Sequence, residues 1–224
     1  MASHELFINE IFHSLQGEST LAGVPFAFVR LTGCNLRCTY CDSTYAFHDG
    51  KRMTIDEVCA AVAPFSTRHV LLTGGEPLMQ KNTPALAQVL VDKGYDVSVE
   101  THGELPIGPV VQNTRVIMDI KTPSSGMQRG GYRTNLPLLK ETDEVKFVIA
   151  SESDYAWARD LVRSETIPVK EILFSPVGPS GGAPGSYPGI SAQVLAERIL
   201  ADRLRVRMQI QLHKIIWGAD ARGV

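Results

Sequence analysis

Three of the four cysteines, Cys34, Cys38 and Cys41, lie within eight residues in the order C-x3-C-x2-C. Thiols this close along the chain cannot pair in disulfides without strain, but their thiolates can converge on one metal centre. Cysteine thiolates hold iron–sulfur clusters and zinc, and structural zinc sites close with four ligands. No fourth cysteine follows at ligand spacing. Three thiolates on a cubane cluster would leave one iron open for a ligand, which favours catalysis over simple electron transfer.

Other interpretations of this segment, the cysteine loop (residues 34–41), stay open. A structural zinc site could use His48 or His102 as its fourth ligand, because sites with three cysteines and one histidine exist. Three unligated core thiols are disfavoured, because the loop also carries an arginine and a threonine. The fourth cysteine, Cys59, lies among alanines in a helical pattern and is expected to be a buried structural thiol.

Two further motifs carry groups that could bind a ligand. Residues 73–77 (TGGEP) follow a predicted strand. Their paired glycines would let a ligand approach the backbone, and Glu76 could accept from an ammonium group, although GGEP alone could be an ordinary tight turn. Residues 15–18 (LQGE) carry amide and carboxylate oxygens that could accept from a ligand edge rich in N–H groups, or form a solvated turn.

Three basic side chains have two interpretations each. Arg30 lies at the end of a predicted buried strand and needs an anionic partner, which could be a ligand carboxylate or a local Asp or Glu. Lys146 alternates with Val145 and Phe147, so it should face away from them, into the mouth of a barrel or into solvent. His213, in the motif QLHK, could contact a ligand or be a hydrogen-bonded core histidine.

The strands that must position these residues alternate with helices, which predicts a parallel sheet with crossover helices. The candidate residues follow the carboxyl ends of strands, where such folds place their sites. We therefore expect an α/β fold, an open partial (β/α) barrel, as a single domain over residues 1–224. The first buried strand, 26–31, should lead directly into the cysteine loop. Further strands are expected at 69–73, 96–100, 116–120, 144–150, 171–175 and 207–212.

Two of the predicted helices carry capping signals. A helix over 54–63 should begin with a capping box of Thr54 and Glu57 and end at Pro64. Thr83 should cap the next helix, which has a proline at its first position and ends at a glycine. The remaining helices are expected at 153–163 and 191–203. The connections 121–138 and 176–189 are longer than usual, so they should be functional or mobile.

Composition narrows the classes of function. With 224 residues, 44% of them hydrophobic, the chain can bury a sizeable core. Its formal net charge of −2 gives no basic field, which disfavours direct nucleic-acid binding. No apolar run reaches transmembrane length, and the N-terminal residues do not resemble a signal peptide. Clustered free thiols then indicate a reducing, cytoplasmic location.

The order C-x3-C-x2-C, with an aromatic residue before the last cysteine, resembles the radical S-adenosylmethionine (SAM) superfamily. A narrower resemblance rests on LQGE, the G-x-P that follows it, R-x3-CNLRCTYCDS, TGGEP and QLHK. Together these motifs resemble the 7-carboxy-7-deazaguanine synthase family of queuosine and deazapurine biosynthesis, from Ile11 to the C-terminus. The cysteines and TGGEP are shared by the superfamily, whereas LQGE and QLHK are more specific to the family.

This resemblance implies a radical SAM carbon–nitrogen lyase that converts 6-carboxy-5,6,7,8-tetrahydropterin to 7-carboxy-7-deazaguanine with loss of ammonia. It implies a [4Fe–4S] cluster, SAM and Mg2+ as cofactors. Reductive cleavage of SAM would give a 5′-deoxyadenosyl radical that takes a hydrogen from C6 of the pterin, and SAM would be regenerated after ring contraction. The protein would bind and orient the reactants and exclude side reactions. A homodimer and an electron donor such as flavodoxin or ferredoxin are also implied, with no nucleic-acid or membrane partner.

Matched position by position, the three clustered cysteines would hold the cluster, and no other side chain is expected to be catalytic. Ser43 stands where the family most often has a magnesium-ligating threonine; a serine hydroxyl can serve, and Thr44 is the alternative. The family's Ser-Pro-Lys segment reads here as KTPS, so the identity of the lysine that contacts SAM stays open. The implied SAM contacts are Tyr40, Cys41, Asp42, Gly75, Glu76, Lys121, Thr122, Ser124, Lys146, Ser175, Pro176 and Val177. The implied substrate contacts are Leu15, Gln16, Gly17, Glu18, Arg30, Thr73 and His213.

Two other functions compete with this interpretation. A glycyl-radical-enzyme activase has a similar cluster and size but acts on a large protein, and it has no need for LQGE or a buried Arg30. A non-catalytic iron–sulfur or zinc protein is the alternative from another class, and iron and sulfide analysis would separate it.

Overall fold

The structure, a computed structural model, describes residues 4–177 and 189–224. These residues form a nine-stranded sheet in the order β3-β1-β2-β4-β5-β6-β7-β8-β9. The neighbours from β2 to β9 are parallel, and β1 pairs antiparallel with β2 and β3. The strands are β1 (Glu5–Leu15), β2 (Pro25–Leu31), β3 (Lys51–Thr54), β4 (His69–Gly74), β5 (Asp96–Thr101), β6 (Arg115–Asp119), β7 (Glu144–Ile149), β8 (Glu171–Pro176) and β9 (Arg207–Met208).

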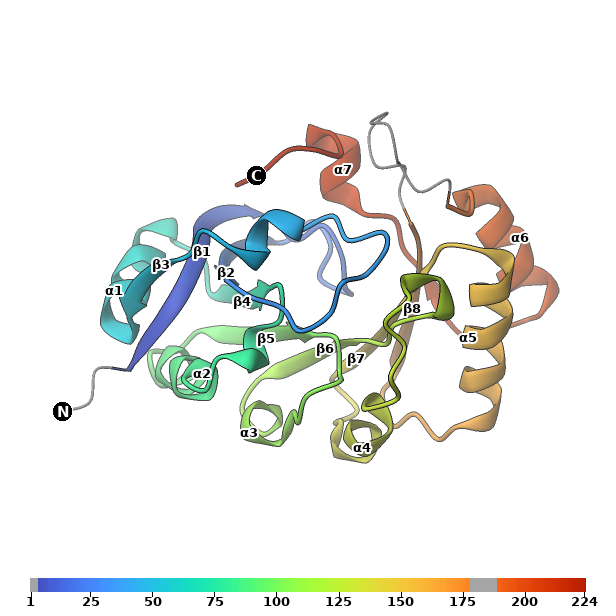
Figure 1. Cartoon of the computed structure of the whole chain (residues 1–224), viewed down its shortest axis with the longest axis horizontal. Helices are drawn as coiled ribbons and strands as arrows, with labels where there is room; N and C mark the ends of the chain where they lie inside the picture. Colours follow the sequence, from blue (N-terminus) through green and yellow to red (C-terminus); the bar gives the residue numbers. More distant parts are fainter. Residues whose placement is uncertain (1–3, 178–188) are drawn as a thin grey trace.

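Helices cover the outer side of this curved sheet. Figure 1 shows α2 to α5 along that side, with α7 and the cysteine loop on the opposite, inner side. The parallel strands joined by crossover helices confirm the predicted open partial barrel. The α-helices are α1 (Ile55–Val62), α2 (Thr83–Asp92), α3 (Gly108–Val111), α4 (Tyr132–Asn135), α5 (Glu152–Ser164), α6 (Ala192–Ala201) and α7 (Leu212–Trp217).

Alternation along the strands sorts side chains between the two faces of the sheet. Outward-facing residues such as Val145 and Phe147 belong to the main core beneath the helices. A smaller apolar cluster, which includes Phe28, Leu71 and Ile117, occupies the inner face. Burial of these apolar side chains is the main term that stabilises the barrel.

Nearer the carboxyl ends of the same strands, the inner face becomes polar. Side chains two positions apart share a face, and two residues beyond the smaller cluster stand Arg30 on β2, Thr73 on β4 and Asp119 on β6. The barrel therefore has an apolar interior below and a polar mouth above, which is where a polar ligand can bind.

Residues 26–31 form the predicted buried strand, β2, but sequence reasoning missed β1 before it and β3 after it. Both are antiparallel additions at one edge of the sheet. β1 is partly exposed and has polar residues on both faces, including Asn9, Glu10 and His13. An edge strand of this kind lacks the continuous apolar run that marks a central parallel strand.

The prediction of a strand over 207–212 is correct for its first two residues and wrong for the rest. β9 ends at Met208, and α7 begins at Leu212. The backbone N–H of Leu212 donates to Gly17 over 2.9 Å. The chain therefore leaves the sheet to contact the loop after β1, and QLHK starts a helix.

The helix signals are mostly confirmed. Thr54 and Glu57 form the predicted capping box of α1, which ends at Val62. Thr83 is the first residue of α2 and not its cap, and its hydroxyl donates to the carbonyl of Pro77 over 2.5 Å.

The two long connections differ in what the structure describes. Residues 121–138 contain two 3-10 turns and α4, so this connection is folded. In the second connection, Pro176 ends β8, and residues 178–188 lie outside the described ranges. No helix in the described ranges is long and apolar enough to cross a membrane.

Candidate active site

A cavity of about 480 Å³ lies at the polar mouth of the barrel, within the range of roughly 300–1,000 Å³ typical of small-molecule sites. The cysteine loop, the TGGEP turn and inner residues of β5, β6 and β7 form part of its wall. Residues 15–18, the start of α7 and the C-terminal residues 219–224 form the rest. Sequence reasoning missed this last segment, which carries no motif.

Most of the predicted site residues meet on this wall. It includes the three clustered cysteines, both candidate magnesium ligands and every predicted substrate contact. Of the predicted SAM contacts, it includes Tyr40, Cys41, Asp42, Gly75, Lys121, Lys146 and Val177. The other predicted SAM contacts are described by the structure but do not line the cavity; they are Glu76, Thr122, Ser124, Ser175 and Pro176.

The thiols of the cysteine loop are free and partly exposed, which excludes the core-thiol interpretation. Cys59, in contrast, is buried on α1 as predicted. Burial raises the pKa of the Cys38 thiol to about 11, although nearby Lys121 opposes the shift. The backbone N–H of Leu36 donates to the Sγ of Cys34 over 3.4 Å. Hydrogen bonds to sulfur of this kind tune iron–sulfur centres.

These donors fit an iron–sulfur cluster better than a zinc ion. In the described ranges, no three His, Cys, Asp or Glu side chains are arranged to hold a single ion, whereas the thiolates of a cluster can each bind a different iron. His102, a candidate fourth zinc ligand, has Nδ1 bonded to the N–H of Glu104 and Nε2 bonded to Asn35. His48 is exposed and does not line the cavity.

The TGGEP turn lies directly against the cysteine loop. A Cβ on Gly75 would stand 2.3 Å from the carbonyl oxygen of Gly33 and 2.7 Å from the Cβ of Cys34. Gly74 has φ +151°, and a Cβ there would stand 2.2 Å from the carbonyl oxygen of Leu31. The paired glycines are therefore required for the close approach of two loops, as well as leaving backbone open to a ligand.

Glu76 has a different role from the one predicted for its side chain. It is fully buried and points toward the end of β5. Its carboxylate accepts from the N–H groups of Leu78 and His102, each over 2.9 Å, and from the hydroxyl of Thr101. Burial raises its pKa to about 7, against the opposing effect of these donors. The side chain therefore holds the turn on the sheet, and the turn presents its backbone to the cavity.

A buried charge network crosses the floor of the cavity. Lys146 is 3% exposed, so the solvated interpretation is wrong. Its Nζ lies 2.6 Å from Glu18, 2.5 Å from Glu100 and 3.4 Å from Asp119, which also pairs with Lys121 at 3.1 Å. Burial alone would lower the pKa of Lys146, but the three carboxylates together raise it well above its usual value. The lysine is therefore charged and holds the carboxylates in place.

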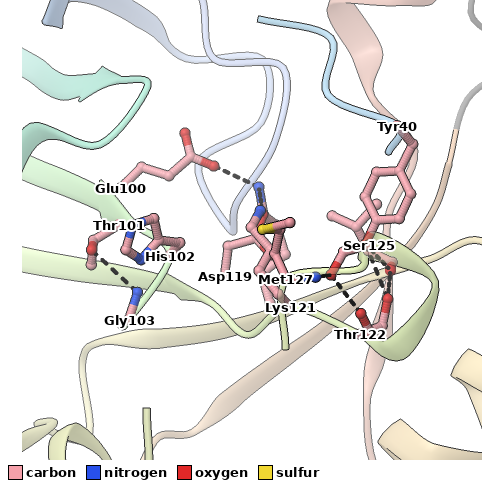
Figure 2. A network of polar contacts seen from close by, with 12 residues as sticks. Tyr40, Glu100, Thr101, His102, Gly103, Asp119, Lys121, Thr122, Ser125 and Met127 are labelled. Carbon is pink, nitrogen blue, oxygen red and sulfur yellow. Dashed lines mark hydrogen bonds and ion pairs between the residues drawn. The ribbon is translucent and has the colours of Figure 1, made fainter. Parts of the chain in front are cut away.

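Figure 2 shows part of this network beside Tyr40 of the cysteine loop. Asp119 and Lys121 stand between His102 on one side and Tyr40 on the other. The hydroxyl of Tyr40 lies 3.0 Å from that of Thr122, which is fully buried and bonds the carbonyl of Val148. Thr122 thus fixes the position of Tyr40 from below.

The segment 15–18 reaches the cavity from the amino ends of the parallel strands, because Leu15 pairs with Pro25 at the start of β2. It follows the antiparallel strand β1 and then folds inward, so that Glu18 meets Lys146 and accepts from Gln211 over 2.8 Å. A Cβ on Gly17 would stand 2.0 Å from the Nδ1 of His213, so glycine lets the ring pack on the backbone. The motifs LQGE and QLHK therefore form one structural unit.

Arg30 has a structural partner that sequence reasoning left unnamed. Its Nε donates to Glu10 on β1 over 2.7 Å, and Glu10 also accepts from Tyr45 over 3.0 Å. The guanidinium lies beside the ring of Tyr45 and lines the cavity. Within the described residues, no hydrogen bond of the guanidinium other than that to Glu10 is found. The ion pair is therefore present, and the group still faces the site.

The two magnesium candidates stand beside an acidic side chain. Ser43 donates to Asp42 Oδ1 over 2.9 Å, and Lys214 of QLHK donates to Asp42 Oδ2 over 2.7 Å. Burial alone would raise the pKa of Asp42, but Lys214 outweighs it and keeps the carboxylate ionised. Ser43 and Thr44 both line the cavity, so their positions do not separate them.

Two further predicted SAM contacts, Ser124 and Ser175, do not line the cavity. Ser124 bonds Asp154 and Ser151 at the start of α5. The hydroxyl of Ser175 is buried, without a hydrogen-bond partner among the described residues. Ser124 therefore anchors the connection that carries Lys121.

Comparison with known proteins identifies relatives along nearly the whole chain. The model of the radical SAM superfamily matches residues 28–125. A 7-carboxy-7-deazaguanine synthase from Chlorobaculum tepidum is 47% identical over 223 residues, which cover 98% of this chain and 97% of that protein. The protein of the same name from Koribacter versatilis is 42% identical, over 97% of this chain and 99% of its own length.

Solved structures show the same fold. The crystal structure of QueE from Escherichia coli superposes with a TM-score of 0.73 at 23% identity, over 93% of this chain and 95% of that one. SuiB from Streptococcus suis bound to S-adenosylmethionine superposes with a TM-score of 0.55 at 12% identity, over 80% of this chain and 48% of that one. At these identities the similarity establishes architecture alone.

Proposed function

The chain belongs to the 7-carboxy-7-deazaguanine synthase family of the radical SAM superfamily, and we propose that it converts 6-carboxy-5,6,7,8-tetrahydropterin to 7-carboxy-7-deazaguanine with loss of ammonia. One observation carries the proposal: the cysteine loop and the joined LQGE and QLHK motifs face the same cavity. The cofactor motif shared by the superfamily thus lies next to the motifs more specific to the family.

Cys34, Cys38 and Cys41 would hold a [4Fe–4S] cluster, with SAM beside the TGGEP turn. When bound, these cofactors supply a 5′-deoxyadenosyl radical. The chain's own residues bind and orient the reactants around them. The backbone of the TGGEP turn and the Tyr40 side chain form the wall on this side. The ion pair of Lys121 and Asp119 also lines the cavity here and holds both charged groups in place.

The opposite side of the cavity would bind the pterin. A tetrahydropterin has an edge rich in N–H groups, and Glu18 and Glu100 supply carboxylate oxygens that Lys146 holds in place. Arg30 would bind the substrate carboxylate through the guanidinium nitrogens that Glu10 does not use. Thr73 donates to Glu100 over 3.2 Å and so orients it. The pterin would then be fixed at both ends.

Further parts of the proposal concern the assembled enzyme. Mg2+ would bind beside Ser43 or Thr44, near the substrate carboxylate, because it favours oxygen ligands from protein and substrate together. A one-electron donor such as flavodoxin or ferredoxin would reduce the cluster. We expect a homodimer in the cytoplasm, where the thiols of the cysteine loop stay reduced.

The direct test is anaerobic reconstitution with iron and sulfide, followed by incubation with SAM, a reductant and 6-carboxytetrahydropterin. Mass spectrometry should detect 7-carboxy-7-deazaguanine and the release of ammonia. Consumption of SAM without conversion of the pterin would contradict the proposal.

A further inference from the structure

His102 stands between the cysteine loop and the TGGEP turn. It follows β5 directly and is 5% exposed. Its Nδ1 accepts the backbone N–H of Glu104 over 3.0 Å, so the proton of the neutral ring lies on Nε2. Burial lowers the pKa of His102 to about 4, which keeps the ring neutral near pH 7.

The Nε2 atom lies close to oxygens on two different segments. The Oδ1 of Asn35 in the cysteine loop lies 2.8 Å away, and the Oε2 of Glu76 in the TGGEP turn lies 3.2 Å away. Asn35 directly follows the first cysteine of the loop, Cys34. The side chain of His102 therefore bridges the two segments that would contact the cluster and SAM.

Leu36 is buried in the middle of the cysteine loop, and the other hydrogen bonds that tie the loop to the rest of the protein lie near its ends. A backbone hydrogen bond of 2.8 Å ties Gly33 to the TGGEP turn, before the first cysteine. Thr39 bonds the connection 121–138 near the other end. Between these points, Arg37 donates to carbonyls of the loop itself. Within the described residues, the side chain of Asn35 therefore supplies the hydrogen bond that links residues 35–37 to the rest of the protein.

We propose that His102 is a positioning residue, which sets the orientation of the first two cluster ligands relative to the TGGEP turn by bridging Asn35 and Glu76. The inference rests on the proposed function, because it requires a cluster on the cysteine loop and SAM beside the turn. A ligand that contacts both segments binds more tightly when they are already held in place, because less conformational freedom is lost on binding.

The test uses the reconstituted chain and measures its iron content, its dissociation constant for SAM, and the change that SAM causes in the EPR spectrum of the reduced cluster. His102→Asn should keep its iron, weaken SAM binding by about fivefold to tenfold, as expected for the loss of one hydrogen bond, and alter the EPR change. His102→Gln should stay near wild type, because its Nε2 can donate from the place of the histidine Nε2. His48→Ala, at an exposed position outside the cavity, is the control.

Asn35→Ala removes the acceptor at an exposed position, where loss of the fold is not expected. It should reproduce the effect of His102→Asn, and the double variant should be no worse than either single one, because both remove the same contact. Wild-type affinity and EPR spectra in His102→Asn and Asn35→Ala would overturn the positioning role, as would equal defects in His102→Asn and His102→Gln.

Product formation is assayed separately. A wild-type chain that binds SAM and shows these effects, but forms no deazaguanine, would refute the proposed function and leave the positioning role standing.

Discussion

The two sides of the cavity are held together in different ways. On the proposed cofactor side, the TGGEP turn meets the cysteine loop through backbone atoms, with Gly75 packed against Gly33 and Cys34. On the proposed substrate side, segments join through charged side chains, and Lys146 pairs with Glu18, which is 128 positions away in the sequence. Close backbone contact requires glycine, so it leaves a motif that can be recognised in the sequence. A charge network consists of scattered Asp, Glu and Lys residues, which cannot be told from ordinary surface residues in the sequence.

The glycines on the two sides show the same difference. A side chain on Gly75 would meet backbone atoms of Gly33, which cannot move without shifting Cys34, a proposed cluster ligand. A side chain on Gly17 would meet the ring of His213, which can rotate away. The cofactor side is therefore the less tolerant of substitution, and the substrate side can adjust. The following predictions test this contrast, from the largest expected effect to the smallest.

The largest effect is expected from the thiols. Cys34→Ala, Cys38→Ala or Cys41→Ala should each abolish SAM cleavage, because a cluster held by three thiolates loses a ligand in each case. Cys59→Ala is the matched control, since this thiol is buried on α1 away from the cavity. Iron content and SAM cleavage measure the outcome. Full activity in Cys38→Ala, or loss of iron in Cys59→Ala, would contradict the assignment of the three clustered cysteines as cluster ligands.

The next effect concerns the charge network. Lys146→Met leaves three carboxylates without their shared cation, and breaking a buried pair of this kind costs about 3–5 kcal/mol of the free energy of unfolding. Binding of the pterin should also fall, because Glu18 and Glu100 are no longer held. Lys170→Met removes an exposed pair with Glu141 and should change stability by less than about 1 kcal/mol. Thermal and denaturant unfolding measure both. Equal stability of the two variants would show that the network does not hold the substrate side together.

The contrast also explains what the sequence could predict. The cysteine loop, TGGEP and the central parallel strands follow from local patterns, since thiol spacing, paired glycines and apolar runs each reflect a nearby physical requirement. The partly exposed antiparallel strand β1 lacks an apolar run, so its Glu10 could not be named as the partner of Arg30. Likewise, nothing local in the sequence pairs His102 with Asn35. These contacts depend on the tertiary arrangement of distant segments, which single-sequence patterns do not encode.

Arg30 tests whether one side chain serves both structure and substrate. Arg30→Ala should weaken pterin binding by about 2–4 kcal/mol, the loss of a charge-assisted contact. The pair with Glu10 is partly exposed, at 15% and 20% for the two side chains, so its loss should lower stability by about 1 kcal/mol or less. Glu10→Gln is the matched control, which loosens the pair but keeps the guanidinium in the cavity. Calorimetry of pterin binding alongside thermal melting separates the roles. A large fall in melting temperature with unchanged affinity would assign Arg30 to structure alone.

The smallest effect is expected where the two sides meet, at the proposed magnesium site. Ser43→Ala removes a hydroxyl that already lies 2.9 Å from Asp42 Oδ1, so a cation beside the substrate carboxylate would lose one of several oxygen ligands. Because water and substrate can supply the others, we expect SAM binding to survive and the magnesium affinity to fall by roughly tenfold, with turnover only weakly dependent on magnesium. Thr44→Val, which removes the neighbouring hydroxyl at nearly constant volume, is the matched control and should keep the wild-type response. Titration of turnover with Mg2+ at fixed SAM and pterin measures both.

If the responses are reversed, Thr44 is the ligand. If neither variant changes the response, magnesium binds elsewhere in the cavity, and Ser43 serves to orient the Asp42 carboxylate that Lys214 holds ionised.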